Sequence, residues 1–496
     1  MFNQSQSRLS YCFGLLMFSS AVSSCHSQTA ATPVTVSSLA ELRAVASKPN
    51  QRVTLKAGDY WLESNGSNPF LDLSGANSSF NFANCHIRVD SRQLKGFGRG
   101  HENTARILQM SGENVTVDGL KLSVEVVDGE ESVADMSTNT VEIIGSGDVL
   151  RNCEITTRGS RPYGSGDAFG KGARPANGNQ PDGTPFFEHS KNCGVRVGKG
   201  AGNVTIEGVT LHVRAFGHGI FFQEGSHDIT VRNCTVEAGP LASSNDVIAD
   251  PLYQQYGKTT YGQKINPDIR LSKSEDGIRV YGPTGVYGAV KNIRIENCRV
   301  LRMRDAYAMV DVEGTLEIKN CEAWNCETGF TPARVGNTSI VGCKGDALNG
   351  PLLFFRRGGN NVSAQIELTG DEAPVGLWPI AIISGTNNKV TLTRSGKSKY
   401  PDNAFIMVSQ AWREWRHRTA TNIDSDKGVL PTTGLVLDNK TGIGVVLGTK
   451  ANNSTVESNA PVLDKGANNT IKAPTKKTDV LRFEDTWGQY QLYPAL

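Results

Sequence analysis

The sequence predicts an all-β fold: a single-stranded right-handed parallel β-helix solenoid with an N-terminal capping helix. Three observations predict it. The chain is rich in glycine, with 53 residues, and only 7% of its residues are aromatic. A template of strand, one-residue corner and second strand recurs along the chain, which is the sequence mark of a solenoid. Few segments have the periodicity of a helix.

The corner of this template is always Asn or Gly, as in VTIEGVTL (204–211) and ITVRNCTV (229–236). Asn tolerates a left-handed backbone, and its amide can bond to the same group in the next coil. The shortest spacings, 23 residues from Asn297 to Asn320 and 22 from Asn320 to Gly342, fit one coil of three short strands. Longer spacings indicate coils with inserted loops. The full set of corners is Gly119, Asn152, Gly208, Asn233, Asn297, Asn320 and Gly342.

The chain divides into four regions. Residues 1–25 are an expected export signal, in which the apolar stretch 11–22 precedes Val22-Ser23-Ser24-Cys25. This ending resembles a bacterial lipobox and predicts lipidation of Cys25, with ordinary signal cleavage as the alternative. Residues 26–50 form the expected cap, with an amphipathic helix at 37–47; residues 51–475 form the solenoid and residues 476–496 a C-terminal tail.

Charge and hydropathy limit the partners. The chain has 51 Lys and Arg against 49 Asp and Glu, which gives no electrostatic footprint for nucleic acid. A membrane-spanning helix needs about 18 consecutive apolar residues, and no segment after residue 25 approaches that length. Membrane attachment is therefore expected only through the lipid anchor. We expect a monomer in the bacterial cell envelope, at the outer membrane or in the periplasm, or a secreted one.

Five cysteines each follow a corner residue: Cys153, Cys234, Cys298, Cys321 and Cys343. Stacked coils would place them in one interior column as small buried apolar residues. Disulfides are the alternative in an exported protein, but one column offers no evident pairing.

A third strand is expected in each coil, and its outward face is the expected working face. Six segments align as this strand: 139–144, 193–198, 218–223, 276–281, 307–312 and 328–333. If Ile220, Phe222, Ile278 and Val280 point inward, the alternate residues point outward. The predicted outward column is Glu142, Arg196, Phe221, Gln223, Arg279, Tyr281, Met309 and Asp311, with Arg334 beyond. The insertions 126–138, 158–190 and 240–275 would wall a groove beside it, long enough for several sugar units.

From about residue 50 to 475 the repeat resembles the pectate-lyase-like right-handed β-helix superfamily. That resemblance implies an exposed sheet that binds acidic or neutral polysaccharides, as in lyases, glycoside hydrolases or epimerases. Gly217-His218-Gly219 is similar to the GHG element of polygalacturonases. The paired-Asp elements upstream and the Arg-x-Lys element downstream do not occur here in that family's order.

The favoured function is an exported polysaccharide lyase that acts by β-elimination on a uronate-containing glycan. A lyase needs a cation beside the uronate carboxylate and a base for the C5 proton. Arg196, Arg279 or Arg334 could supply the cation, and His218, Lys273 or Tyr281 the base. We predict His218, Arg279, Asp276 and Lys273 as catalytic residues, and Arg196, Gln223, Tyr281, Asp305, Asp311 and Arg334 as substrate-binding residues. No metal or other cofactor is expected; Ca²⁺ held by Asp276, Glu275 or Asp305 is the alternative.

Two other functions stay open. A glycoside hydrolase would use two carboxylates, Asp276 with Asp305 or Asp311 of the next coil. A non-catalytic glycan-binding lipoprotein would use aromatic platforms such as Trp412 and Trp415 in AWREWRHR (411–418). The outward column is mainly charged, which favours an enzyme.

Overall fold

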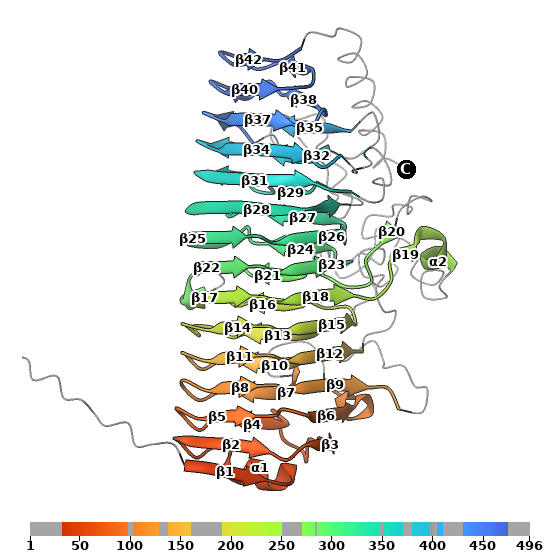
Figure 1. Ribbon diagram of the computed structural model, residues 1–496, viewed down its shortest axis with the longest axis vertical. Coiled ribbons are helices and arrows are strands. Elements are labelled where there is room, and N and C mark those ends of the chain that lie inside the picture. The colour runs from red at the N-terminus through yellow and green to blue at the C-terminus, as the bar shows by residue number, and fades with distance from the viewer. Residues whose placement is uncertain are drawn as a thin grey trace, which may run out of the picture.

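A computed structural model describes the solenoid in detail. The described residues are 32–97, 103–127, 137–159, 191–249, 270–282, 285–347, 351–370, 379–396, 398, 400, 404–409 and 430–474. Coils stack along one long axis, and the chain winds from the N-terminal coil to the C-terminal coil (Figure 1). Every strand pairing between coils is parallel and in register over most of its length, as in Val195↔Ile220 and Ile220↔Ile278. The architecture is the predicted right-handed parallel β-helix.

One strand of each coil belongs to a 13-stranded parallel sheet. Its members are β4 (Leu71–Leu73), β7 (Ala105–Met110), β10 (Thr138–Ile143), β13 (Asn192–Val197), β16 (Ile220–Phe222), β21 (Ile278–Val280), β24 (Asp305–Ala308), β27 (Thr328–Thr331), β29 (Leu353–Phe354), β32 (Pro379–Ile383), β35 (Phe405–Val408), β38 (Gly444–Leu447) and β41 (Val462–Asp464).

The other two sides of the coils form a second, larger sheet. Its first row contains β1 (Thr32–Val36), β2 (Gln51–Leu55), β5 (Ser79–Asn81), β8 (Thr116–Asp118), β11 (Val149–Arg151), β14 (Thr205–Glu207), β17 (His227–Arg232), β22 (Val290–Glu296), β25 (Val312–Lys319), β28 (Asn337–Ala347), β31 (Val362–Leu368), β34 (Lys389–Arg394), β37 (Val436–Lys440), β40 (Thr455–Ser458) and β42 (Thr470–Lys472). Its second row contains β3 (Gly58–Trp61), β6 (Cys85–Asp90), β9 (Lys121–Glu125), β12 (Glu154–Arg158), β15 (Thr210–Arg214), β18 (Thr235–Ala238), β23 (Arg299–Leu301) and β26 (Glu322–Cys326).

Short elements complete the fold. The remaining strands are β19 (Ala242–Ser243), β20 (Arg270–Leu271), β30 (Gly359–Asn360), β33 (Gly385–Thr386), β36 (Thr432–Thr433) and β39 (Ala451–Asn452). The helices are α1 (Leu39–Val45), α2 (Ser244–Ala249), η1 (Ser91–Leu94) and η2 (Gly285–Tyr287). Within the described part of the chain, no helix combines the length and apolar character that crossing a bilayer requires.

The predicted helix at 37–47 is α1, which Ser38 caps by accepting a hydrogen bond from the Glu41 amide. Its buried residues Leu39 and Leu42 face the N-terminal coil. The parallel ladder begins earlier than the sequence suggested, because β1 already pairs with β2 from Thr32 onward. That α1 closes the end of the solenoid stays a prediction.

The predicted corners are confirmed, because all seven have a positive φ, from 52° at Asn297 to 73° at Gly119. The corner amides form the expected ladder. Asn320 donates to Asn297 at 3.3 Å and Asn297 donates to Asn233 at 3.2 Å. Both contacts join adjacent coils. The left-handed backbone therefore explains why the corner is restricted to Asn and Gly.

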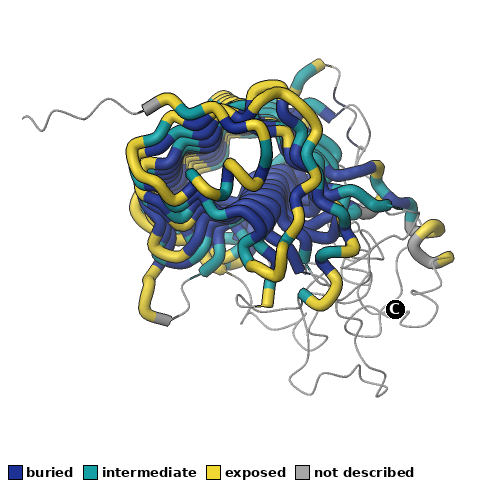
Figure 2. Tube along the Cα trace, turned by 90° about the horizontal axis from the view of Figure 1, so that it is seen from below, coloured by how far each residue is buried: buried dark blue, intermediate teal, exposed yellow. Residues whose placement is uncertain are grey.

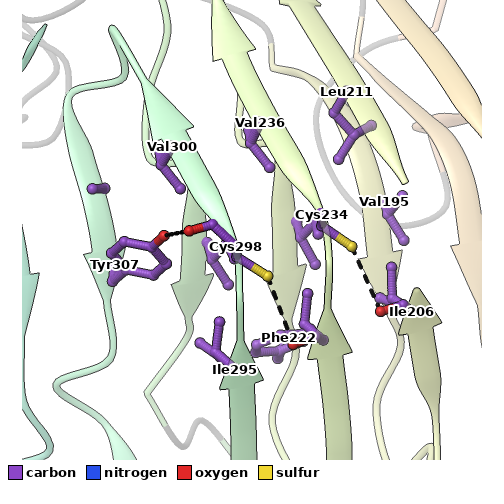
Figure 3. Close-up of a cluster of buried hydrophobic side chains, with 14 of the residues drawn as sticks. Val195, Ile206, Leu211, Phe222, Cys234, Val236, Ile295, Cys298, Val300 and Tyr307 are labelled. Carbon is purple, nitrogen blue, oxygen red and sulfur yellow. Dashed lines mark hydrogen bonds between the residues drawn. The ribbon is translucent and has the colours of Figure 1, made fainter. Parts of the chain in front are cut away.

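The core fills the interior of the coils along the whole axis, as the buried residues in the view down that axis show (Figure 2). The five cysteines after the corners are buried thiols in one column, without disulfides, as predicted, and Cys85, Cys193 and Cys326 are buried as well. Figure 3 shows Cys234 and Cys298 on neighbouring strands, each with its sulfur directed at a backbone carbonyl.

Candidate active site

Charged side chains gather where four neighbouring coils enter the 13-stranded sheet. Lys191 precedes β13, His218 precedes β16, Glu275 and Asp276 precede β21, and Arg304 precedes β24. His218 and Asp276 are fully buried, and Glu275 is 2% exposed. Burying this many charges is costly unless they are paired, so their partners decide what the site can do.

Both neighbours of His218 are glycine because a side chain would not fit at either position. A Cβ on Gly217 would lie 2.1 Å from the Asn192 carbonyl oxygen, and a Cβ on Gly219 would lie 2.3 Å from Cγ1 of Val236. Neither distance is possible for a side chain. The Gly-His-Gly sequence therefore lets the backbone of one coil approach its neighbours closely, and this approach fixes His218 between coils.

The contacts of His218 indicate which ring nitrogen carries its proton. The Asp276 backbone N–H donates to Nδ1 at 3.3 Å, so Nδ1 is an acceptor and the neutral ring carries its proton on Nε2. Nε2 lies 2.7 Å from the Tyr281 oxygen and 3.0 Å from Oε2 of Glu275. Burial lowers the pKa of His218 well below its usual value, and the positive charge of Lys191 adds to this effect. His218 is therefore neutral at physiological pH.

Asp276 is a fixed anion between two arginines. Arg304 Nε donates to its Oδ1 at 2.9 Å, and Arg279 pairs with its Oδ2. Burial alone would raise the pKa of Asp276, but Arg304 and Arg279 outweigh it and hold this pKa well below the usual range. Asp276 therefore orients the two arginines and stays ionised.

Three side chains of the cluster reach the surface. The Lys191 side chain is 32% exposed, the Arg279 side chain is 24% exposed, and Tyr281 is half-buried. Lys191 Nζ lies 2.6 Å from Glu275 Oε2 and 3.2 Å from the Tyr281 oxygen. The guanidinium carbon of Arg279 lies 4.7 Å from the centre of the Tyr281 ring. Tyr281 is thus a partly exposed residue with two nitrogens beside its hydroxyl oxygen.

The predicted outward column is confirmed for four of its members. Ile220, Phe222, Ile278 and Val280 lie in the core, and the strand register aligns Glu142, Arg196, Phe221 and Arg279 on the opposite face. Met309 was placed wrongly, because it is fully buried in the core. Tyr307 pairs with Ile278, whereas the predicted alignment placed Met309 opposite Ile278. The segment given as 307–312 should therefore begin two residues earlier, at residue 305.

Arg196 does not join the cluster. It pairs with the buried Glu142, and burial lowers the pKa of Arg196. Phe221 lies between Arg196 and Arg279 in the register, so these two arginines are two strands, about 10 Å, apart. Arg196 therefore belongs to a neighbouring part of the same face.

Asp305 and Asp311 lie on the C-terminal side of the cluster. Asp305 accepts a hydrogen bond from Thr328 Oγ1 and lies 3.9 Å from Nη1 of Arg356. Asp311 accepts a hydrogen bond from Arg357 at 3.0 Å. Arg302, three residues before Asp305, pairs with Glu237 at 3.2 Å.

The other predicted residues lie outside these contacts. Gln223 follows β16, and its backbone N–H bonds the Val197 carbonyl. Arg334 is exposed in the turn after β27. The charge of Lys273 acts on Asp246 in α2, and Glu275 is the residue of this segment that contacts His218.

The sequence analysis named neither Lys191 nor Arg304 as a site residue. Both directly precede a strand of the 13-stranded sheet, and Glu275 and Asp276 stand three and two residues before another of its strands. Extending each aligned segment by three residues toward the N-terminus would have included Lys191, Glu275 and Arg304.

The outward face changes character along the axis. After Thr331 its column continues with apolar residues, all less than 9% exposed: Phe354, Ile382, Met407 and Val446. Among the described residues of this column, the charged side chains thus lie between Asp72 in β4 and Arg279 in β21. A site that handles charged groups lies in that part.

The described residues contain no group of three His, Cys, Asp or Glu side chains placed to hold a metal ion. Two of the carboxylates considered as Ca²⁺ ligands, Glu275 and Asp276, already contact Lys191, Arg279 and Arg304. Cys25, Trp412, Trp415 and most of the three long insertions lie outside the described residues.

No family model and no curated protein matches the sequence. Solved structures with a similar fold include the family 28 exopolygalacturonase of Yersinia enterocolitica, with 13% identity, a TM-score of 0.43, and coverage of 88% of this chain and 76% of that one. The polygalacturonase of Erwinia carotovora has 11% identity and a TM-score of 0.39, covering 90% and 95%. A PL6 alginate lyase in complex with a trisaccharide has 11% identity and a TM-score of 0.45, covering 91% and 87%. At these identities the likeness concerns the fold and leaves the reaction open.

Proposed function

We propose that the protein is an exported polysaccharide lyase that cleaves a uronate-containing glycan by β-elimination. The observation that carries this proposal is the environment of the Tyr281 hydroxyl. The residue is partly exposed, its hydroxyl oxygen contacts the neutral His218 at 2.7 Å and the Lys191 ammonium at 3.2 Å, and the Arg279 guanidinium covers its ring. An acid–base group flanked by cations is what elimination from a uronate requires.

Each surface group takes one role in the reaction. Lys191 Nζ and His218 Nε2–H both point at the Tyr281 oxygen, so they are placed to hold negative charge there once its proton has left. Tyr281, whose phenolic proton has first gone to solvent, removes the C5 proton of the uronate. The C–H electron pair forms the C4–C5 double bond, the C4–O glycosidic bond breaks, and the leaving oxygen takes up the proton that Tyr281 has just accepted. Arg279 and Lys191 neutralise the uronate carboxylate, which stabilises the carbanion that develops at C5.

His218 is a positioning residue in this scheme, because it is fully buried and reaches the substrate only through Tyr281. The buried Asp276 orients Arg279, and Glu275 orients Lys191. The sequence-based assignment of His218 as base is thereby moved to Tyr281, which the sequence also offered for this role.

The hydrolase alternative has weaker support. A glycoside hydrolase needs one carboxylic acid that is protonated at working pH. Asp276 was the carboxyl group common to both predicted pairs, and its two arginines hold its pKa well below the usual range. A carboxylate held in this way is a poor proton donor.

The test compares Tyr281→Phe with Tyr60→Phe on a panel of uronate polysaccharides. The first substitution removes only the candidate acid–base oxygen. The second removes the hydroxyl of Tyr60, a residue of β3 on another side of the solenoid. That hydroxyl donates to the Lys56 carbonyl. We expect Tyr281→Phe to lower kcat by at least about 100-fold and Tyr60→Phe to leave it within a factor of about two. Equal activity of the two variants would contradict the assignment.

The absence of a metal requirement is part of the proposal. The guanidinium and ammonium groups of Arg279 and Lys191 take the place that Ca²⁺ would have beside the substrate carboxylate. We therefore expect the rate to be unchanged in EDTA. Loss of activity in EDTA with recovery on added Ca²⁺ would contradict this part.

Export and lipidation are proposed from residues 1–25 of the sequence. Cells fed radiolabelled palmitate should incorporate label into the full-length chain, and Cys25→Ser should abolish that label. Secretion of the unlabelled wild-type chain into the medium would instead support ordinary signal cleavage.

A further inference from the structure

We propose a second carbohydrate subsite at the turn edge that follows β10, β13, β16 and β21, where an acidic sugar ring stacks on Tyr287 and pairs with Lys199. The proposal rests on the proposed function only in taking the ligand to be a uronate polysaccharide. The subsite lies beyond the C-terminal ends of these strands, whereas Lys191, His218 and Glu275 precede the strands.

The first observation is exposed apolar surface. Val286 is 93% exposed, Tyr287 is 53% exposed and Ile144 is 39% exposed. These are three of the seven large apolar side chains that are exposed among the described residues, and all three belong to this edge. The turn containing Lys199 joins them, because a Cβ on Gly198 would lie 2.6 Å from Ile144 and Lys199 Nζ lies 5.4 Å from the Tyr287 ring centre. Exposed apolar side chains that gather at one edge are typical of a contact site.

The second observation is that the backbone of the neighbouring coil supports Tyr287. The Gly225 N–H donates to the Gly288 carbonyl at 3.0 Å. A Cβ on Gly225 would lie 2.9 Å from the Tyr287 Cβ, and a Cβ on Gly200 would lie 3.9 Å from its ring. Glycine at position 225 lets the η2 turn lie close against the adjoining turn, and Gly200 is in ordinary contact distance of the ring. The ring is therefore held in place while half of the residue stays open to solvent.

The third observation is the arrangement of charge. The Lys199 side chain is 41% exposed, and its partner Glu224 is only 2% exposed. Arg357 is 56% exposed and pairs with Asp311, which is 12% exposed, a few coils further along. At both places the cation faces solvent and its counter-ion lies beneath. The edge therefore presents positive charge to a ligand.

Together these features fit an acidic sugar. The C–H face of a pyranose ring stacks on a tyrosine ring, and a uronate carboxylate can pair with an adjacent lysine. A neutral sugar gains the stacking but no ion pair. The subsite therefore takes the uronate residues of the same polymer and increases affinity for long chains over short ones.

The experiment measures binding separately from cleavage, in a Tyr281→Phe background. Native gels containing polygalacturonate, alginate or the neutral polymer dextran are run with Tyr287→Ala, Tyr287→Phe and Lys199→Gln. The matched control is Trp61→Ala, because Trp61 is 49% exposed but lies in β3. We expect Tyr287→Ala and Lys199→Gln to weaken binding to one of the polyuronates by about fivefold, while Tyr287→Phe and Trp61→Ala retain it.

The outcomes separate the two proposals. Polyuronate binding that depends on Tyr287 supports the subsite even if the wild-type protein releases no unsaturated product, which would refute only the lyase assignment. If Tyr287→Ala binds like Trp61→Ala, the subsite is refuted, whatever the protein cleaves. Equal weakening of dextran and polyuronate binding by Lys199→Gln would overturn the acidic preference. Circular dichroism identifies an unfolded variant, and Tyr287→Phe tests the ring in a chain that keeps its packing.

Discussion

Asp148 holds a place in the turn after β10 that elsewhere in the solenoid is held by asparagine. In the turn before β34, Asn388 accepts a hydrogen bond from the Val362 N–H at 2.9 Å and donates to the Gly359 carbonyl at 2.8 Å. Asn469 makes the same two contacts, to Ser454 and Ala451. Both amides thus use one oxygen as an acceptor and one nitrogen as a donor to the preceding coil.

Asp148 can reproduce this pattern only when protonated. Its Oδ1 accepts from the Val115 N–H at 2.8 Å, while Oδ2 is fully buried and has no hydrogen-bond partner as a carboxylate. An ideal Cβ on Gly145 would lie 2.7 Å from that oxygen and 1.8 Å from the Gly112 carbonyl. Gly466 takes the place of Gly145 in the turn that contains Asn469. An ideal Cβ there would likewise lie 2.7 Å from the Asn469 side-chain nitrogen and 1.8 Å from the Ala451 carbonyl oxygen. Oδ2 therefore faces a carbonyl and must donate.

The energetic effect follows from the pKa. Burial raises the pKa of Asp148 from 3.8 to about 7. Between these values the folded chain keeps a proton that the unfolded chain has released, so stability falls as pH rises from about 4 to about 7 and then levels off. The full penalty, about 3 pKa units, is about 4 kcal/mol above pH 7. Asp148→Asn should remove it.

The assay is thermal unfolding of the full chain, followed by circular dichroism at pH 4 and pH 8. With an unfolding entropy of about 2.1 cal/mol/K per residue over roughly 400 residues, 4 kcal/mol corresponds to about 5 °C. We expect Asp148→Asn to raise Tm by about that amount at pH 8 and by little at pH 4. The control is Asp59→Asn, at a carboxylate that is 67% exposed. A Tm gain that is equal at both pH values would refute the reasoning.

Three further predictions follow from the same physics. Asn388→Asp should place a carboxyl group in the same kind of turn and lower Tm more at pH 8 than at pH 4, and an unchanged Tm at pH 8 would count against it. Arg304→Met should destabilise the fold by about 3 to 5 kcal/mol in urea titrations, because the buried Asp276 loses a partner; a loss below about 1 kcal/mol would show that Arg279 suffices. The eight described cysteines should resist a thiol reagent in the native protein and react after denaturation, and fast reaction of the native protein would contradict their burial.

The fold could be predicted from the sequence because its rules are local. A left-handed corner admits little besides Asn and Gly, so Asn297 and Asn320 revealed the period of the coils. The two-residue alternation of a strand then assigned Arg279 and Tyr281 to the outer face. Both inferences need only one residue and its immediate neighbours.

The site was harder to predict because its residues lie where that alternation ends. Lys191 and Glu275 stand before their strands, in turns where the side-chain direction depends on the neighbouring coil. The alignment of 307–312 failed for a related reason. Arg302 adopts a left-handed φ of 58°, which a long side chain rarely does, and the strand after it begins at Asp305. The ionisation of His218 and Asp276 depends on burial by other coils, which no sequence pattern reports.

The measurement that tests the central claim most directly is incubation of the purified wild-type protein with uronate and neutral polysaccharides, recording new reducing ends and the ultraviolet absorbance of unsaturated products together. The account predicts that both signals rise in step on a uronate polymer and that both are lost in Tyr281→Phe. Reducing ends without the absorbance would contradict elimination and point to hydrolysis. Silence in both signals across the panel would contradict an enzyme of this kind and favour a glycan-binding protein.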